Sequence, residues 1–327
     1  MGKFLESEKI NQAHFKATSP TISEAARSDG IYKGKPRSFC LPREYAQENL
    51  YPPIREKAMQ FWADHHIKWH DGADGKPSNH LCSSMVCGVN FLFPFADQPD
   101  ALAETLRPFY PDLKRMLPVE SGSYVSFEWI GAENYLSERM QKNSTRTRGA
   151  NFTSADSVVL FERMDGKRHV ALIEWKYTES YGSQSKLIAS SGTDRSTIYR
   201  HLFDQPDCPI NREILPGFAD LFYEPFYQFL RQQFLAHEME KAHELGADIV
   251  SVLHICPACN TDFRKVTSPN LRPLGNTAIE VWKKLLMQPD RFQSVSIEEL
   301  FGTLTAERVP AKADWLAYVR ERYWWMP

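Results

Sequence analysis

The sequence lacks long apolar runs, repeats and any excess of positive charge. None of its apolar stretches reaches the roughly 18 residues typical of a membrane-spanning helix, and the opening MGKFLESEKINQAHFK has no apolar core of a secretory signal. Lysine and arginine (39) are balanced by aspartate and glutamate (41), which gives a net charge of −2. We therefore expect a globular, cytoplasmic protein without membrane contact, on which any basic surface must be local.

Cysteine is also scarce. The chain has 6 cysteines in 327 residues, too dispersed for a disulfide framework. Cys256 and Cys259 form one CxxC pair, and a structural zinc site needs a second pair, for which Cys82 and Cys87 alone have a similar spacing. We therefore expect ordinary reduced cysteines, and zinc is not expected.

Hydrophobic periodicity divides the rest into clustered strands among helices. Alternating segments separated by turns predict strands at 123–131, 153–164, 169–179 and 249–255. Helical patterns cover 54–70, 80–95, 219–245, 275–287, 296–302 and the C-terminal residues, and 100–116 reads as a short helix broken around Pro108 and Pro111. The segments 1–45 and 180–214 look irregular. The order predicts an α/β or α+β sandwich, organised as an arm and helical part (1–100), a core (101–265) and a C-terminal helical cap (266–327), together one compact unit.

Two charges stand inside the apolar strand HVALIEWKYT. With a period of two, Glu174 and Lys176 share one face with Val170 and Leu172, while Ala171, Ile173, Trp175 and Tyr177 share the other. Charged side chains are seldom buried unless they are paired or bind a metal. The dipeptide Asp165-Gly166 predicts a hairpin turn, which would bring Asp156 of the preceding strand close to Glu174 and Lys176.

Converging carboxylates repel one another unless a cation lies between them. Two carboxylates with a backbone oxygen and water suit a hard divalent ion such as Mg²⁺. A protonated lysine beside such an ion can orient a water molecule or stabilise the charge that develops on a phosphoryl group. The residues Asp156, Glu174 and Lys176 therefore indicate hydrolysis of a phosphodiester.

These residues resemble a known motif. Ser154-Ala155-Asp156 followed by IEWK at 173–176 resembles the PD-(D/E)XK, or restriction endonuclease-like, nuclease superfamily, although Ala155 stands where the motif has proline. The blocks RGANFTSAD, LIEWKYTESY, YEPFYQFLRQQFLA and HLCSSMVCGVNFLFPF are similar to a subgroup of bacterial and archaeal restriction endonucleases.

The resemblance implies a restriction endonuclease-like core (αβββαβ, a central mixed sheet flanked by helices) with N-terminal and C-terminal helical elaborations. It also implies that Asp156, Glu174 and the carbonyl of Trp175 hold Mg²⁺, with Mn²⁺ as an alternative ion, and that Lys176 assists the attacking water.

The same resemblance leads us to expect a further upstream acid. Glu128, on the polar face of SYVSFEWIG, is the preferred candidate. Its rivals are Glu104, Glu133 and Glu138.

Two further groups could contact nucleic acid. On the predicted helix at 219–245, Gln228, Arg231 and Gln232 form a polar stripe, and we predict that Gln228 and Arg231 contact the scissile phosphate or a bound water. A basic run before Asp156 could line a DNA groove, although such runs are often only solvated loops. Its members are Arg139, Lys142, Arg146 and Arg148.

The resulting prediction is a Mg²⁺-dependent endonuclease that hydrolyses DNA to leave a 5′-phosphate, in restriction, defence or DNA processing. DNA is the expected partner, and two copies could pair as a homodimer. The alternatives are a nuclease acting on RNA or on branched or damaged DNA, and a non-catalytic nucleic-acid-binding protein of the same fold.

Overall fold

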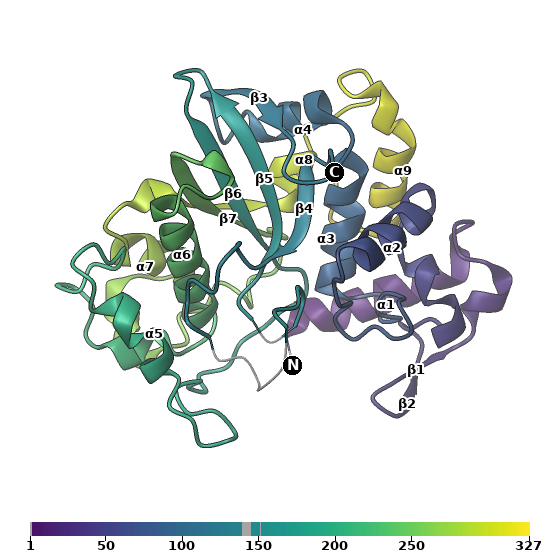
Figure 1. Cartoon of the computed structure of the whole chain (residues 1–327). Helices are drawn as coiled ribbons and strands as arrows, with labels where there is room; N and C mark the ends of the chain where they lie inside the picture. Colours follow the sequence, from purple (N-terminus) through teal and green to yellow (C-terminus); the bar gives the residue numbers. More distant parts are fainter. Residues whose placement is uncertain (1, 139–144, 151) are drawn as a thin grey trace.

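A mixed β-sheet with helices on both faces forms the centre of the molecule (Figure 1). The computed structural model describes residues 2–138, 145–150 and 152–327. The described residues form a six-stranded sheet, which confirms the predicted mixed α/β class. Its strands are β3 (Leu113–Leu117), β4 (Val125–Trp129), β5 (Ala155–Arg163), β6 (Arg168–Trp175), β7 (Ile249–Cys256) and β8 (Phe292–Ser296).

Strand directions change in the middle of the sheet. The strands β3 and β4 both pair antiparallel with β5, β3 along its second half and β4 along its first half. The β5–β6 pair is also antiparallel, and β7 and β8 then continue in parallel with β6. The predicted hairpin between β5 and β6 is confirmed, and Gly166 adopts the positive φ (82°) that favours glycine in such a turn.

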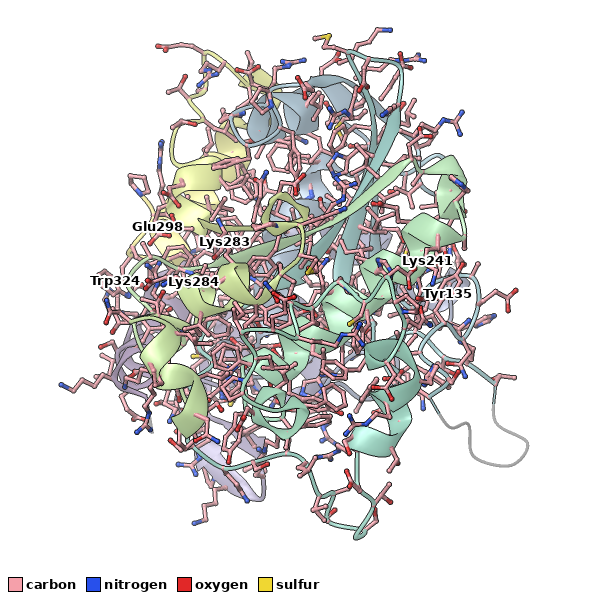
Figure 2. All side chains as sticks on the ribbon, turned by 90° about the vertical axis from the view of Figure 1, so that its left-hand side faces the viewer. Tyr135, Lys241, Lys283, Lys284, Glu298 and Trp324 are labelled. Carbon is pink, nitrogen blue, oxygen red and sulfur yellow. The ribbon has the colours of Figure 1, made fainter. Side chains whose placement is uncertain are left out.

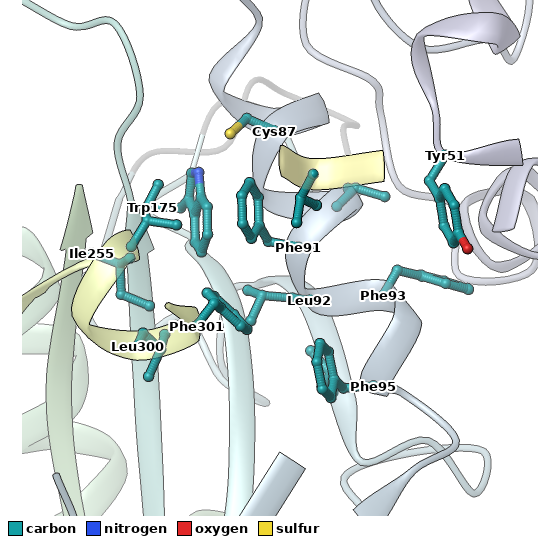
Figure 3. Close-up of a cluster of buried hydrophobic side chains, with 14 of the residues drawn as sticks. Tyr51, Cys87, Phe91, Leu92, Phe93, Phe95, Trp175, Ile255, Leu300 and Phe301 are labelled. Atoms are coloured by element: carbon teal, nitrogen blue, oxygen red, sulfur yellow. The ribbon is translucent and has the colours of Figure 1, made fainter. Parts of the chain in front are cut away.

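One face of the sheet is covered by helices from both ends of the chain (Figure 1). On β6, Ala171, Ile173 and Trp175 point into this layer, as the alternation predicted. Figure 3 shows Trp175 among Phe91 and Phe301, with ring centroids 5.4 and 6.4 Å from its own. The layer contains α1 (Lys3–Thr18), α2 (Arg55–Asp64), α3 (Ser84–Leu92), α4 (Pro99–Leu106), α8 (Ile297–Phe301) and α9 (Ala313–Arg322).

The other face packs Val170 and Leu172 against a second helical layer. Its members are α5 (Ser196–Phe203), α6 (Phe226–Lys241) and α7 (Ala278–Leu285). Figure 2 looks onto this side of the molecule, where Lys241, Lys283 and Lys284 are exposed. These helices are therefore amphipathic, with charge outward and apolar residues on the sheet.

Shorter elements complete the chain. A hairpin of β1 (Gly30–Tyr32) and β2 (Lys35–Arg37) follows α1. The 3₁₀ turns are η1 (Glu24–Arg27), η2 (Arg43–Asn49), η3 (Pro52–Ile54), η4 (Phe93–Phe95), η5 (Phe218–Leu221), η6 (Glu244–Gly246), η7 (Pro269–Leu274), η8 (Pro289–Arg291) and η9 (Pro310–Lys312). None of the helices in the described ranges combines the length and apolar character that crossing a bilayer requires.

Several predicted boundaries were wrong. The segment 1–45 was expected to be irregular but begins with the 16-residue helix α1. The short helix expected within 100–116 ends at Leu106, in agreement with the expected break around Pro108 and Pro111, but the strand β3 that follows was not predicted. The helix at 54–70 ends at Asp64. The segment 180–214, expected to be irregular, contains α5, and β8 was not predicted.

A buried arginine joins the two ends of the chain. Arg322 of α9 is 1% exposed, and its guanidinium donates hydrogen bonds to Gln12 Oε1 (3.1 Å) and to the carbonyl oxygens of Asn49 (2.6 Å) and Leu81 (3.1 Å). Gln12 lies on α1 and donates to the hydroxyl of Tyr177 at 3.1 Å. The helices α1 and α9 therefore lie together behind the segment that follows β6.

Candidate active site

Three carboxylates lie in a row across three adjacent strands. In the β4–β5 register, Phe127 pairs with Ser157 and Trp129 with Ala155, which places Glu128 beside Asp156. In the β5–β6 register, Ser157 pairs with Ile173, which places Asp156 beside Glu174. The sheet therefore brings together three acids that are far apart in the sequence.

Lys176 joins two of these acids. Its ammonium lies 2.6 Å from Glu174 Oε1 and 3.6 Å from Asp156 Oδ2. Glu174 and Lys176 are only 4% and 6% exposed, whereas the Asp156 side chain is 30% exposed. The predicted grouping of Asp156, Glu174 and Lys176 is present, and solvent reaches it from the side of Asp156.

Main-chain contacts fix the orientation of Asp156 and Trp175. The N–H of Trp175 donates a 2.7 Å hydrogen bond to Asp156 Oδ2. The carbonyl of Trp175 accepts a hydrogen bond from Ser84 Oγ at 3.3 Å. Because the indole of Trp175 is packed between α3 and α8, the apolar layer holds this peptide unit, and with it Asp156, in place.

Burial disfavours the charged forms of the two glutamates of the row. Burial raises the pKa of Glu174 to about 7 against the opposing effect of Lys176, and burial with the neighbouring Asp156 raises the pKa of Glu128 to about 8. Burial disfavours the charged form of Lys176, but Asp156 and Glu174 outweigh it and keep its pKa well above the ordinary value. Lys176 therefore remains an ammonium at neutral pH, and a cation bound beside the two glutamates would favour their charged forms.

Glu128 has an unusual backbone conformation for a strand residue. Its φ is +49°, in the left-handed region that side chains other than glycine rarely adopt. Its Oε2 accepts a hydrogen bond of 2.6 Å from Ser154 Oγ. Strained residues of this kind cluster at functional sites, so the conformation of Glu128 favours it over its rivals as the additional acid.

The three rival acids have other partners or lie at the surface. Glu138 accepts hydrogen bonds from Thr153 and from the hydroxyl of Tyr199 (2.8 Å). Glu104 forms a surface ion pair with Arg107 at 3.2 Å, and Glu133 is exposed.

Helix α6 reaches the site through a residue that the sequence prediction did not select. Gln232 Nε2 donates to Glu174 Oε2 (2.7 Å) and to the carbonyl of Ser154 (2.6 Å). Gln232 belongs to the same polar stripe as Gln228 and Arg231, but the sequence did not reveal how the helix is rotated against the sheet. This polar stripe was the feature of the sequence that could have identified Gln232.

The two predicted residues of α6 lie further from the acids. The hydroxyl of Tyr181 donates to Gln228 Oε1 at 3.2 Å. Arg231 donates to Thr153 Oγ1 at 3.4 Å and lies over the ring of Tyr227, 4.8 Å from its centroid, and its charge favours the ionised form of Glu174. Arg231 is thus near the acid row, while Gln228 contacts Tyr181.

The predicted basic groove gains no support from the described side chains. Arg146 donates to the carbonyl oxygens of Ile130, Gly131 and Ala132. Arg148 pairs with Glu120 at 2.9 Å and donates to Ser126 Oγ at 2.6 Å. Both guanidinium groups are occupied within the protein, and Arg139 and Lys142 lie outside the described residues.

The donor set suits a hard cation. Asp156, Glu174 and the Trp175 carbonyl offer only oxygen atoms, and Mg²⁺ is commonly bound through one or two carboxylates together with substrate phosphates and water. Within the described part of the chain, no three histidine, cysteine or acidic side chains are arranged to hold one ion. The residues therefore fit a site of two carboxylates rather than a closed protein cage.

Comparison with known protein families places the chain in one of them. A sequence model of the family described as Restriction Endonuclease associating with ARP (REase-ARP) matches residues 8–324. No curated protein and no solved structure matches the chain. The family match extends over α1, the whole sheet and α9, so that the acid row and both helical layers lie within it. The chain belongs to the restriction endonuclease-associated family REase-ARP.

Proposed function

We propose that this protein is a Mg²⁺-dependent endonuclease of the PD-(D/E)XK kind that hydrolyses phosphodiester bonds of DNA. One observation supports the proposal most directly: the Lys176 ammonium bridges Glu174 and Asp156 at the exposed end of a buried acid row. Burying these charges costs free energy, so packing alone does not explain the combination. Membership of a restriction endonuclease family supports DNA as the substrate.

In this proposal Asp156, Glu174 and the Trp175 carbonyl would hold the ion. A bound Mg²⁺ would supply Lewis-acid polarisation of the phosphate and a more acidic water. Lys176, kept protonated by its neighbours, orients the attacking water by donating a hydrogen bond and stabilises the negative charge that grows on the phosphoryl oxygens. It does not act as a base, because its raised pKa prevents it from losing a proton near neutral pH.

Glu128 and Gln232 have separate roles. Glu128, held by a hydrogen bond from Ser154 Oγ, lies beside Asp156 and would serve as the further acid of the site. Gln232 fixes one oxygen of Glu174 through its amide and leaves the other to Lys176. Arg231 contributes positive charge behind Glu174.

The test is cleavage of supercoiled plasmid, linear duplex DNA and RNA in Mg²⁺ or in EDTA. We expect Mg²⁺-dependent nicking of DNA by the wild type, and a loss of roughly 100-fold or more in Lys176→Ala and Asp156→Asn. Lys167→Ala is the matched control, because Lys167 is exposed at the turn before β6. Equal nicking rates in the wild type and Lys176→Ala would show that the proposed mechanism is wrong.

A further inference from the structure

A surface hollow lies beside the start of α3, where Ser84 and Met85 line it. It encloses about 490 Å³, within the range of roughly 300–1,000 Å³ that small-molecule sites occupy. We name it the arm pocket, after the N-terminal segment that forms one part of its wall. Its characteristic lining residues are Tyr32, Lys33, Arg37, Phe39, His80 and Glu179.

The arm pocket adjoins the acid row. A smaller hollow contains Glu128 and Asp156, and Ser84 and Met85 line both this hollow and the arm pocket. Glu179, which lines the arm pocket, follows Lys176 by three positions in the chain. A strand whose phosphate lies at Asp156 could therefore place its neighbouring nucleotide in the arm pocket.

Three aromatic rings meet in the wall of the arm pocket. The ring of His80 lies 4.6 Å from that of Tyr32 and 5.0 Å from that of Phe39, measured between centroids. Burial lowers the pKa of His80 to about 4, so that its ring is neutral at physiological pH. Neutral aromatic rings of this kind are the surfaces on which unpaired bases stack.

Cations surround these rings. The ammonium of Lys33 lies 5.1 Å from the ring centroid of Tyr32, and that of Lys9 lies 5.3 Å from that of Phe39. Lys33 and Arg37 are exposed on the β1–β2 hairpin. In a chain with a net charge of −2, this combination of aromatic rings and positive charge is the chemistry that binds a nucleotide, with stacking for the base and charge for the phosphate.

We propose that the arm pocket binds one unpaired nucleotide next to the scissile phosphate, so that the substrate is a DNA strand that is single-stranded beside the cut. This inference rests on the proposed nuclease function and names its substrate class. Bases within a duplex have both faces covered by their neighbours in the stack, so an aromatic pocket can accept only a base that has left the stack. The proposal assigns specificity for DNA structure to Tyr32, Phe39 and His80, and affinity to Lys33 and Arg37.

Binding without cleavage tests the proposal. Fluorescence anisotropy in EDTA compares a single-stranded oligonucleotide with a blunt duplex of the same length. Against the single strand, we expect Lys33→Ala/Arg37→Ala to bind about tenfold more weakly, and the slope of log K against log salt to shrink by about 1.4 for two lost phosphate contacts. The charge-matched control is Lys35→Ala/Arg43→Ala, which removes two exposed cations outside the arm pocket and should change affinity less than twofold.

A second readout reports stacking directly. A single strand that contains 2-aminopurine should lose fluorescence on binding to the wild type, and Phe39→Leu should abolish this quenching while keeping an apolar side chain. Equal affinity of the pocket and control double variants, or the same loss of affinity for blunt duplex, would overturn the proposal.

The two proposals fail separately. If the pocket variants lose single-strand binding but the wild type shows no Mg²⁺-dependent cleavage, the nuclease function is wrong and the binding site stands. If cleavage depends on Lys176 while the pocket variants bind single strands normally, the arm pocket has no role in binding and the nuclease function stands.

Discussion

Gln232 Nε2 on α6 donates a hydrogen bond of 2.7 Å to Glu174 Oε2 on β6, inside the protein. The same amide group reaches the carbonyl of Ser154, immediately before β5. A single side chain therefore ties the helix to both strands that carry the central acids. Because Lys176 holds the other oxygen of Glu174, the carboxylate has no freedom to rotate.

Gln232→Leu should lower cleavage by roughly tenfold to 100-fold, because a hydrogen bond to a charged group contributes about 1.5–3 kcal/mol. Measured single-turnover rates at saturating DNA report this loss. Gln233→Leu is the matched control, since Gln233 is the next residue of the same helix, is also buried, and has no partner for its Oε1. A Gln232→Leu enzyme as active as the Gln233→Leu control would contradict the role of this amide.

Mg²⁺ should stabilise the fold against heat. A ligand that binds only the folded state at 100 times its Kd adds about 2.7 kcal/mol, which corresponds to a rise of several degrees in Tm. Calorimetry or thermal fluorescence in Mg²⁺ and in EDTA measures the shift. Asp156→Asn should abolish it, and Glu162→Gln, at the other end of β5, should retain it. A shift that persists in Asp156→Asn would place the ion elsewhere.

Stability in EDTA should fall as the pH rises from 6.5 to 8.5. The folded-state pKa values of Glu128 and Glu174, about 8 and about 7, lie above the ordinary value of 4.5. A carboxyl with a raised pKa stabilises the fold while it is protonated, and that contribution is lost as the pH rises through the raised value. Buried His169 and His254 have lowered pKa values of about 3, so their stabilising contribution is lost only as the pH falls below about 6.5.

Urea denaturation midpoints measured between pH 6.5 and 8.5 report how the stability of the fold changes with pH. Glu128→Gln should flatten this dependence between pH 7 and 8.5, because the amide does not ionise. A slope identical to that of the wild type would mean that Glu128 does not titrate in this window.

Arg322→Ala should destabilise the protein by about 3–5 kcal/mol. The substitution leaves Gln12 Oε1, Asn49 Oδ1 and the carbonyl oxygen of Leu81 without the guanidinium donor, and such a loss is among the most costly for a folded protein. Urea denaturation measures the change. Arg320→Ala, two residues earlier on the exposed face of α9, should cost less than about 0.5 kcal/mol. Similar losses of stability in both variants would show that the buried hydrogen bonds of Arg322 contribute no more than an exposed arginine does.

The alternation of β6 was sufficient to predict both faces of that strand and, with the turn at Gly166, the approach of Asp156 to Glu174 and Lys176. Short-range rules succeed here because register follows from the turn and the period of two. The same rules failed for α1, whose buried stripe includes Glu8 and Gln12. Polar residues on a helix indicate a solvated face, and their burial depends on partners such as Tyr177 and Arg322, which the local sequence does not contain.

The contact of Gln232 with Glu174 was not predicted, for a related reason. The polar stripe of α6 was visible in the sequence, but the rotation of a helix against a sheet is set by how its apolar side chains pack. In the fold, Phe229 and Leu230 are buried, and this packing turns Gln232 toward Glu174.

The hydrogen bond between Gln12 and Arg322 spans 310 positions of the chain. During synthesis, α1 leaves the ribosome long before α9 has been made. Until then, Gln12 on the buried face of α1 lacks its partner Arg322. Tyr177, the neighbour of Lys176, receives a hydrogen bond from Gln12, whose side-chain oxygen accepts one from Arg322. We expect a polypeptide truncated before α9 to leave Gln12, and with it the hydroxyl of Tyr177 next to Lys176, without this support.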